Sequence, residues 1–92
     1  MIRSFRHKGL KRLYEDADSR GVVAENVVKL RDILARLDAA RAVGDMEVPG
    51  LRLHPLKGDW KGSWSVTVRA NWRVIFRFAD HDVFDVDYLD YH

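Results

Sequence analysis

The sequence predicts an α+β fold, with two N-terminal helices packed on one face of a small antiparallel sheet. Apolar residues recur with the 3.6-residue period of a helix up to about residue 44. After Gly50 the period changes to two, which is the period of a strand. Helices and an antiparallel sheet bury their apolar sides by stacking as two layers. At 92 residues, we expect one domain over residues 1–92.

The N-terminal half contains a strand candidate at residues 2–5 and two amphipathic helices. The first helix is predicted from an apolar face spaced i, i+3, i+4, i+7, made of Leu10, Leu13, Tyr14 and Ala17. The segment "DSRG" (18–21) ends it. The second helix is expected from about Ala24 to Ala42, with Gly44 as its stop. Its apolar stripe is Val27, Leu30, Leu34 and Leu37.

The C-terminal half predicts four strands, at residues 51–54, 64–70, 71–78 and 83–88. A loop with two glycines fills 57–63, and "ADHD" (79–82) is expected to make the last hairpin turn. The face toward the helices is expected to carry Trp64, Val66, Val68, Trp72, Val74, Phe76, Phe84 and Val86. The sheet therefore has one apolar face and one face left to water.

This second face is predicted to be basic, although the net charge of the chain is only +2. Its expected members are Arg52, His54, Ser65, Thr67, Arg69, Arg73 and Arg77, together with Asp85 and Asp87. Lys57 and Lys61 extend it into the adjoining loop. If the last hairpin has a three-residue loop at 80–82, Arg77 lies opposite Asp85 and Arg73 opposite Leu89, so residues 90–92 emerge beside Arg73.

A basic face that carries an imidazole suits a phosphodiester substrate. RNA is cut without metal when a base removes the 2′-hydroxyl proton and an acid protonates the leaving 5′-oxygen. Histidine suits both roles because its ordinary pKa lies near neutral pH. His54 and His92 are the candidates, with Asp90 as a base or an orienting group. Arg73 is the candidate phosphate clamp, and Tyr91 could stack on a base or bond a phosphate.

Each of these residues also has a structural reading. His54 could be a solvated residue at a strand end, and residues 90–92 could be a tail. Arg77 is interpreted as a cross-strand partner of Asp85. Trp60 differs from Trp64 and Trp72, which alternate in phase with core valines. It lies in a basic, glycine-flanked loop, where it could stack on a base.

Composition limits the classes of protein and of site that are possible for this chain. The chain has no cysteine, which fits a reducing compartment and excludes disulfides and thiolate metal sites. No apolar run is long enough for a signal peptide or a membrane span, so we expect a cytoplasmic protein. No two histidines stand at a metal-ligand spacing on one element, so neither a metal site nor another cofactor is expected.

Three motifs together resemble one family. "HPLKGD" (54–59), "ANWR" (70–73) and the terminal "DYH" (90–92), with "IRSFRHKGLKRLYE" at the start, resemble the HigB toxins of the RelE/ParE superfamily. The resemblance implies a RelE-like microbial ribonuclease fold and a ribosome-dependent mRNA interferase that cuts message in the A site of the 70S ribosome. It also implies a HigA-like helix-turn-helix antitoxin as partner.

The resemblance assigns roles to individual positions. His54, Asp90, Tyr91 and His92 match catalytic residues, Arg73 matches a phosphate-facing arginine, and Lys57 a basic residue beside the site. We further expect RNA or ribosome contacts from Lys57, Lys61, Trp60, Arg52 and Arg69. Two positions depart from the family pattern: Trp60 replaces a residue that is usually basic, and His81 stands where a glycine is usual. Two alternatives stay open, a ParE-like toxin that binds a protein such as gyrase without catalysis, and a plain RNA-binding module.

Overall fold

The computed structural model describes residues 1–91 and confirms the α+β prediction. The helices are α1 (Lys8–Asp16) and α2 (Val27–Ala39), with 3₁₀ turns η1 (Ala24–Asn26), η2 (Val43–Met46) and η3 (Gly58–Trp60). The strands are β1 (His54–Pro55), β2 (Trp64–Arg69), β3 (Trp72–Ala79) and β4 (Asp82–Asp90). They form one antiparallel sheet in the order β1-β2-β3-β4. Within the described residues, no helix is long and apolar enough to span a membrane.

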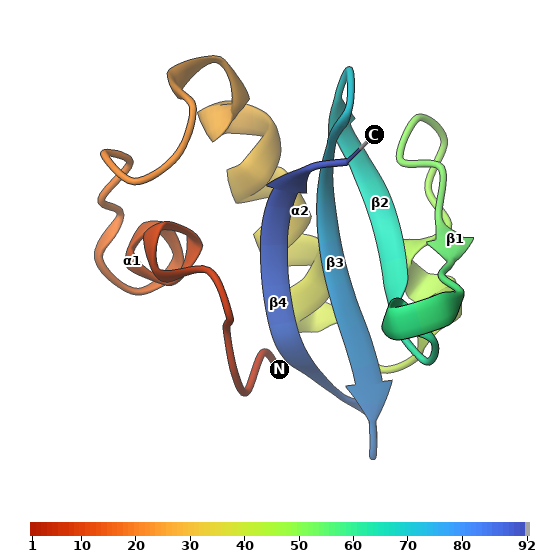
Figure 1. The fold of residues 1–92 in the computed structure, drawn as a ribbon. Coiled ribbons are helices and arrows are strands. Elements are labelled where there is room, and N and C mark those ends of the chain that lie inside the picture. The colour runs from red at the N-terminus through yellow and green to blue at the C-terminus, as the bar shows by residue number, and fades with distance from the viewer. Residues whose placement is uncertain (92) are drawn as a thin grey trace.

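The helices cover one side of the sheet and leave its other face uncovered by helix. Figure 1 shows α2 lying behind the strands, with α1 beside β4. The core between the two layers includes Leu30, Leu37, Val74 and Phe76, each fully buried. Trp64 and Trp72 pack against this core, as their phase with the valines predicts. The face that the helices leave uncovered, which we call the helix-free face, is therefore the one that a ligand can reach.

The helix predictions are right in position but not in every boundary. The α1 helix buries Leu10 and Leu13 and ends at Asp16, because the next residue, Ala17, takes the left-handed conformation at φ 55°. The α2 helix ends at Ala39 rather than Ala42, because Ala40 already has an extended backbone at ψ 139°. Gly44 therefore does not stop the helix and lies in the following 3₁₀ turn η2.

The N-terminal segment extends along β4 without forming the predicted strand at 2–5. It makes two parallel bridges, Ile2 to Val83 and Phe5 to Val86. The Arg3 N–H donates to the Val83 carbonyl at 2.7 Å, and the Val86 N–H donates to Ser4 at 3.1 Å. These bonds pair the outer edge of β4, which would otherwise be open.

Two β-bulges change which face several side chains occupy. One lies between Thr67 and Arg69 on β2, so Arg69 pairs with Trp72 on the helix side of the sheet. Its guanidinium forms an ion pair with Glu25 of η1. The expectation that Arg69 lies on the helix-free face is therefore wrong.

The second bulge lies on β4 at Asp85, whose φ is 56°. The β3–β4 turn has two residues, Asp80 and His81, rather than three, and both have positive φ. The bulge restores the shift, so Arg73 still lies opposite Leu89 as predicted. Before the bulge the faces differ from the prediction. Phe84 pairs with Arg77 outside the core, and the Arg77 guanidinium lies 4.9 Å from the Phe84 ring centroid.

The helix-free face is more covered than expected. Ser65 and Ile75 lie on it as cross-strand partners, yet they are only 6% and 1% exposed. The predicted strand at 51–54 is wrong except at its last residue, because Arg52 takes a positive φ of 53°. The strand β1 is His54–Pro55. This segment pairs with β2 and lines a cavity together with Ser65 and Thr67 of that strand.

A glycine pair holds the start of α1 against the connection to η1. A Cβ built on Gly9 would lie 2.3 Å from the Gly21 carbonyl oxygen, a backbone atom that cannot rotate away. We expect Gly9→Ala to lower the free energy of unfolding by about 1–3 kcal/mol, as for an overpacked site. The measurement is chemical denaturation of the purified chain.

Gly44→Ala is the matched control for this substitution. A Cβ on Gly44 meets nothing within 4 Å, and its φ is not positive. We expect that variant to change stability by no more than about 0.5 kcal/mol. Equal stability of the two variants would contradict the close approach of Gly9 and Gly21.

Candidate active site

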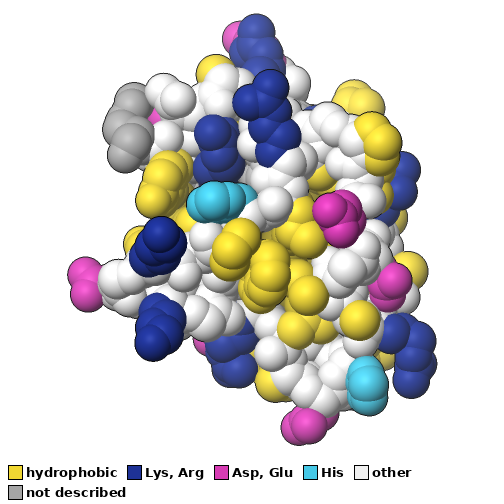
Figure 2. All heavy atoms as spheres, turned by 90° about the vertical axis from the view of Figure 1, so that its right-hand side faces the viewer, with side chains coloured by type: hydrophobic (Ala, Val, Ile, Leu, Met, Phe, Trp, Pro, Cys, Tyr) yellow, Lys and Arg dark blue, Asp and Glu magenta, His cyan; other side chains and the backbone are white. Residues whose placement is uncertain are grey.

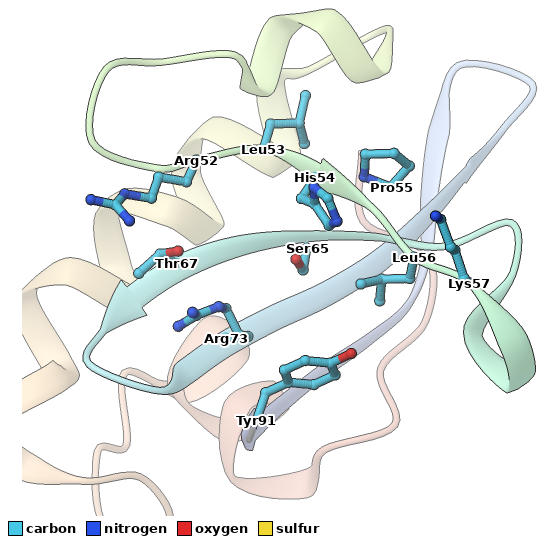
Figure 3. Close-up of a pocket in the computed structure, with 10 residues that line it drawn as sticks. All are labelled: Arg52, Leu53, His54, Pro55, Leu56, Lys57, Ser65, Thr67, Arg73 and Tyr91. Atoms are coloured by element: carbon cyan, nitrogen blue, oxygen red, sulfur yellow. The ribbon is translucent and has the colours of Figure 1, made fainter.

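A cavity of about 530 Å³ opens on the helix-free face, between β1 and the ends of β3 and β4. We call it the basic cavity. It is lined by Arg52, Leu53, His54, Pro55, Leu56, Lys57, Ser65, Thr67, Arg73 and Tyr91. Figure 3 shows His54 and Leu56 reaching from the β1 segment toward Ser65, with Arg73 and Tyr91 on the opposite side.

The β1 segment positions the histidine. His54 lies opposite Ser65 in the β1–β2 ladder and is exposed. Pro55 restricts the residue before it to extended conformations, as the sequence predicts. The Leu56 N–H then donates to the Ser63 carbonyl at 3.0 Å and closes the loop between the strands. The imidazole is therefore held at the cavity wall by short local structure and remains open to a ligand.

Arg73 is held in the cavity by the β2–β3 turn. It lies opposite Thr67 on one side and Leu89 on the other. One guanidinium nitrogen, Nη1, donates to the Ala70 carbonyl at 2.6 Å and to the Trp72 carbonyl at 3.2 Å. These bonds fix the orientation of the planar group, which can then present its other donors to an anion without losing more side-chain freedom.

The end of β4 brings Tyr91 into the cavity. The Tyr91 N–H donates to the Asn71 carbonyl at 2.8 Å, and its side chain lines the cavity while 41% of the residue stays exposed. Asp90 pairs with Trp72 and, by the alternation of a strand, belongs to the opposite face. Asp90 does not line the basic cavity. His92, the other terminal candidate, lies outside the described residues.

Charge distinguishes the basic cavity from the rest of this face. Three cations line it, Arg52, Lys57 and Arg73, and the described lining includes no carboxylate. Among residues 1–91 none of the three forms an ion pair. Figure 2, which views the β1 side, shows Lys and Arg side chains gathered around a histidine and an apolar patch. Such a cavity favours an anionic ligand.

Arg77 has the structural role that the sequence suggested. It forms an ion pair with Asp85 at 3.0 Å, although its ladder partner is Phe84. Trp60 and Lys61 lie outside the basic cavity and line a smaller neighbouring pocket. Arg52 lines the basic cavity at the end opposite Lys57 (Figure 3). Contacts of these residues with RNA or the ribosome stay predictions.

Sequence reasoning missed the apolar wall. Leu53, Pro55 and Leu56 line the basic cavity, and Leu56 is half-buried there. The sequence feature that indicates this apolar wall is the run "LHPL" (53–56), in which two leucines flank the histidine and proline on a segment too short to be a core strand. Among the described residues, no three His, Cys, Asp or Glu side chains are grouped as metal ligands would be.

The fold is that of a RelE-like toxin. The structure aligns with a chain of the YoeB-YefM complex from Staphylococcus aureus at a TM-score of 0.63, with 14% identity, covering 100% of this chain and 98% of that one. The model of the HigB-like toxin family, described as the RelE-like toxin of type II toxin–antitoxin system HigB, matches residues 3–92.

Two relatives agree with the family match. The chain is 48% identical to Endoribonuclease HigB of Proteus vulgaris over the full length of both proteins. It is 34% identical to Toxin HigB-1 of Vibrio cholerae serotype O1, over 100% of this chain and 98% of that protein. The chain therefore belongs to the HigB-like toxin family.

Proposed function

We propose that this toxin is a metal-independent endoribonuclease that cuts messenger RNA in the ribosomal A site. The observation that carries the proposal is the basic cavity, where His54 of β1, Arg73 of β3 and Tyr91, which follows β4, converge. The lining that residues 1–91 provide has no carboxylate. The name of the Proteus vulgaris relative, Endoribonuclease HigB, supports the same activity.

The residues of the cavity divide the reaction between them. A base takes the proton of a 2′-hydroxyl, and that oxygen attacks its own phosphorus while the 5′-oxygen leaves with a proton from an acid. The products are a 2′,3′-cyclic phosphate and a 5′-hydroxyl. His54 lines the cavity and is one of the two proton-transfer groups. His92 is the candidate for the other, because Asp90 belongs to the opposite face of the sheet. Arg73 and Lys57 stabilise the charge that grows on the phosphoryl oxygens.

Tyr91 is placed to hold the nucleotide rather than to carry a charge. Its ring lines the cavity across from Leu56, and its exposed part is open to a base or a phosphate (Figure 3). An aromatic ring in that position stacks on an unpaired base of any kind. The binding it gives is thus largely independent of sequence.

The ribosome is the expected source of substrate orientation. The basic cavity is open, and its described lining has three cations, so it offers little to align a flexible strand for in-line attack. Orientation supplies several kcal/mol of a barrier, so its loss costs orders of magnitude in rate. We expect cleavage of message on a programmed 70S ribosome to exceed that of the same naked RNA by at least about 10³-fold.

The measurement is single-turnover cleavage of one labelled message in both states, with the ends of the product analysed. A 2′,3′-cyclic phosphate end separates this enzyme from a toxin that only binds a protein target and from a module that only binds RNA. Equal rates on the ribosome and on naked RNA would refute the ribosome requirement and leave the nuclease. No cleavage in either state would refute the activity.

The partner is an antitoxin, as for any toxin of a type II system. We propose that it is a HigA-like helix-turn-helix protein. The similar fold of a chain from the YoeB-YefM complex of Staphylococcus aureus supports a paired toxin of this shape. Co-expression with the neighbouring reading frame, followed by affinity purification of the toxin, tests the pairing.

A further inference from the structure

A second pocket lies on the helix-free face beside the basic cavity. It has a volume of about 230 Å³, and Trp60 lies in its wall; we call it the Trp60 pocket. The turn η3 joins the two sites, because its N-cap residue Lys57 lines the basic cavity and its last residue is Trp60. Residues of a single turn of the chain therefore line both sites.

The two sites differ in charge, so they suit different parts of a nucleotide. The basic cavity has three cations and, in its described lining, no carboxylate. Among the residues that the structure describes, the Trp60 pocket has three cations, Arg6, Lys61 and Arg77, against two carboxylates, Asp59 and Asp85. The Arg77–Asp85 ion pair at 3.0 Å neutralises one of each. The first site suits a phosphate, and the second suits a flat, nearly uncharged group.

Trp60 supplies the surface for such a group. Trp60 is half-buried as a residue and lines the pocket. Arg6 and Lys61 beside it are exposed and form no ion pair within residues 1–91. A ring with flanking cations is the arrangement that binds single-stranded nucleic acid by stacking a base and attracting its backbone.

The spacing along β3 fits one RNA strand over both sites. Arg73 lines the basic cavity and Arg77 lines the Trp60 pocket, four residues further along the same strand. Four residues of β-strand extend about 13 Å. A short stretch of single-stranded RNA spans that distance.

We propose that the Trp60 pocket binds an unpaired nucleobase a short distance along the RNA from the phosphate held in the basic cavity. The base belongs either to the message that is cut or to ribosomal RNA at the A site. The inference rests on the proposed function for the position of the phosphate. It adds a base-stacking subsite, through which this chain contacts a neighbouring nucleotide that the basic cavity does not reach.

The test is a titration of the intact protein with a short single-stranded RNA carrying 2′-O-methyl groups, which lacks the attacking hydroxyl. The chain has three tryptophans, so three indole N–H signals are observed by NMR, and Trp60→Phe assigns one of them. We expect the Trp60 signal to move upfield as a base stacks on the ring. Trp64 and Trp72, which pack against the core, are internal controls and should move little.

Affinity for the same RNA gives a second measurement. Trp60→Ala should weaken binding by about 5- to 150-fold, the range for loss of one stacked base. Trp60→Phe should retain most of the affinity. If Trp60→Ala unfolds the protein, Trp60→Phe still allows the stacking to be tested. One abasic position in the RNA should cost the unmodified protein the same factor and cost the Trp60→Ala protein nothing further.

The source of the base is decided by a ribosome-binding arm. If the RNA leaves the Trp60 signal unmoved but Trp60→Ala weakens binding to empty 70S ribosomes by the same factor, the base is ribosomal. If neither the RNA nor the ribosome distinguishes Trp60→Ala from the unmodified protein, the subsite does not exist. That result would leave cleavage by the unmodified chain intact, whereas a chain that stacks RNA on Trp60 but cuts no message refutes the proposed function alone.

Discussion

His54→Ala is expected to slow single-turnover cleavage on programmed ribosomes by about 10²–10⁴-fold, the usual contribution of a positioned proton donor or acceptor. The fold should survive, because His54 is exposed and its side chain packs in no core cluster of the described residues. Its backbone pairing with Ser65 does not depend on the imidazole. We expect the free energy of unfolding to change by no more than about 0.5 kcal/mol.

Two further variants test whether proton transfer is the role that the His54→Ala substitution removes. His54→Gln keeps a polar side chain of similar reach but cannot exchange a proton near neutral pH, so it should be as slow as His54→Ala if proton transfer is the role. His92→Gln tests the second histidine by the same logic. A His54→Ala protein that cuts at the original rate would show that His54 is a solvated strand-end residue and would leave both proton transfers to the terminal residues.

The sequence predicts most of the fold because periodicity records burial directly. The stripe with Leu30 and Leu37 and the alternation with Val74 and Phe76 correspond to fully buried residues. Periodicity cannot record an extra residue in a strand, because the pattern of residue types continues through it. Both bulges were missed for this reason, and each moved a side chain, Arg69 or Phe84, to the other face.

The positions of the candidate-site residues depend on the register between β3 and β4. The prediction for Arg73 is confirmed, because Arg73 lies opposite Leu89. The two-residue turn and the bulge at Asp85 together give the same register as the three-residue turn that the prediction assumed. Tyr91 follows from that register, since it falls on the same face as Leu89. Asp90 falls on the other face by the same alternation, which a motif read as one unit does not reveal.

Arg73→Ala is the other substitution for which we expect a large effect. It should lower the chemical step by about 10²–10³-fold, as loss of one stabiliser of an oxyanion does. Stability should fall by only about 1 kcal/mol, because the bonds from Nη1 to the Ala70 and Trp72 carbonyls are lost at a half-buried position. Circular dichroism and denaturation establish folding, and single-turnover cleavage on ribosomes gives the rate.

Two variants separate the geometry of the guanidinium from its charge. Arg73→Lys retains the charge but has no planar fork, so most of the rate loss should remain if the two phosphoryl oxygens are bound together. Arg36→Ala removes one positive charge from α2, where Arg36 pairs with Asp32, and should cleave as the unmodified chain does. If Arg36→Ala slowed cleavage as much as Arg73→Ala, the overall charge would govern association with the ribosome. If Arg73→Lys were fully active, the cavity would need a cation at this position but not an oriented one, and the fixed bonds of Arg73 to the turn would then serve the fold rather than the reaction.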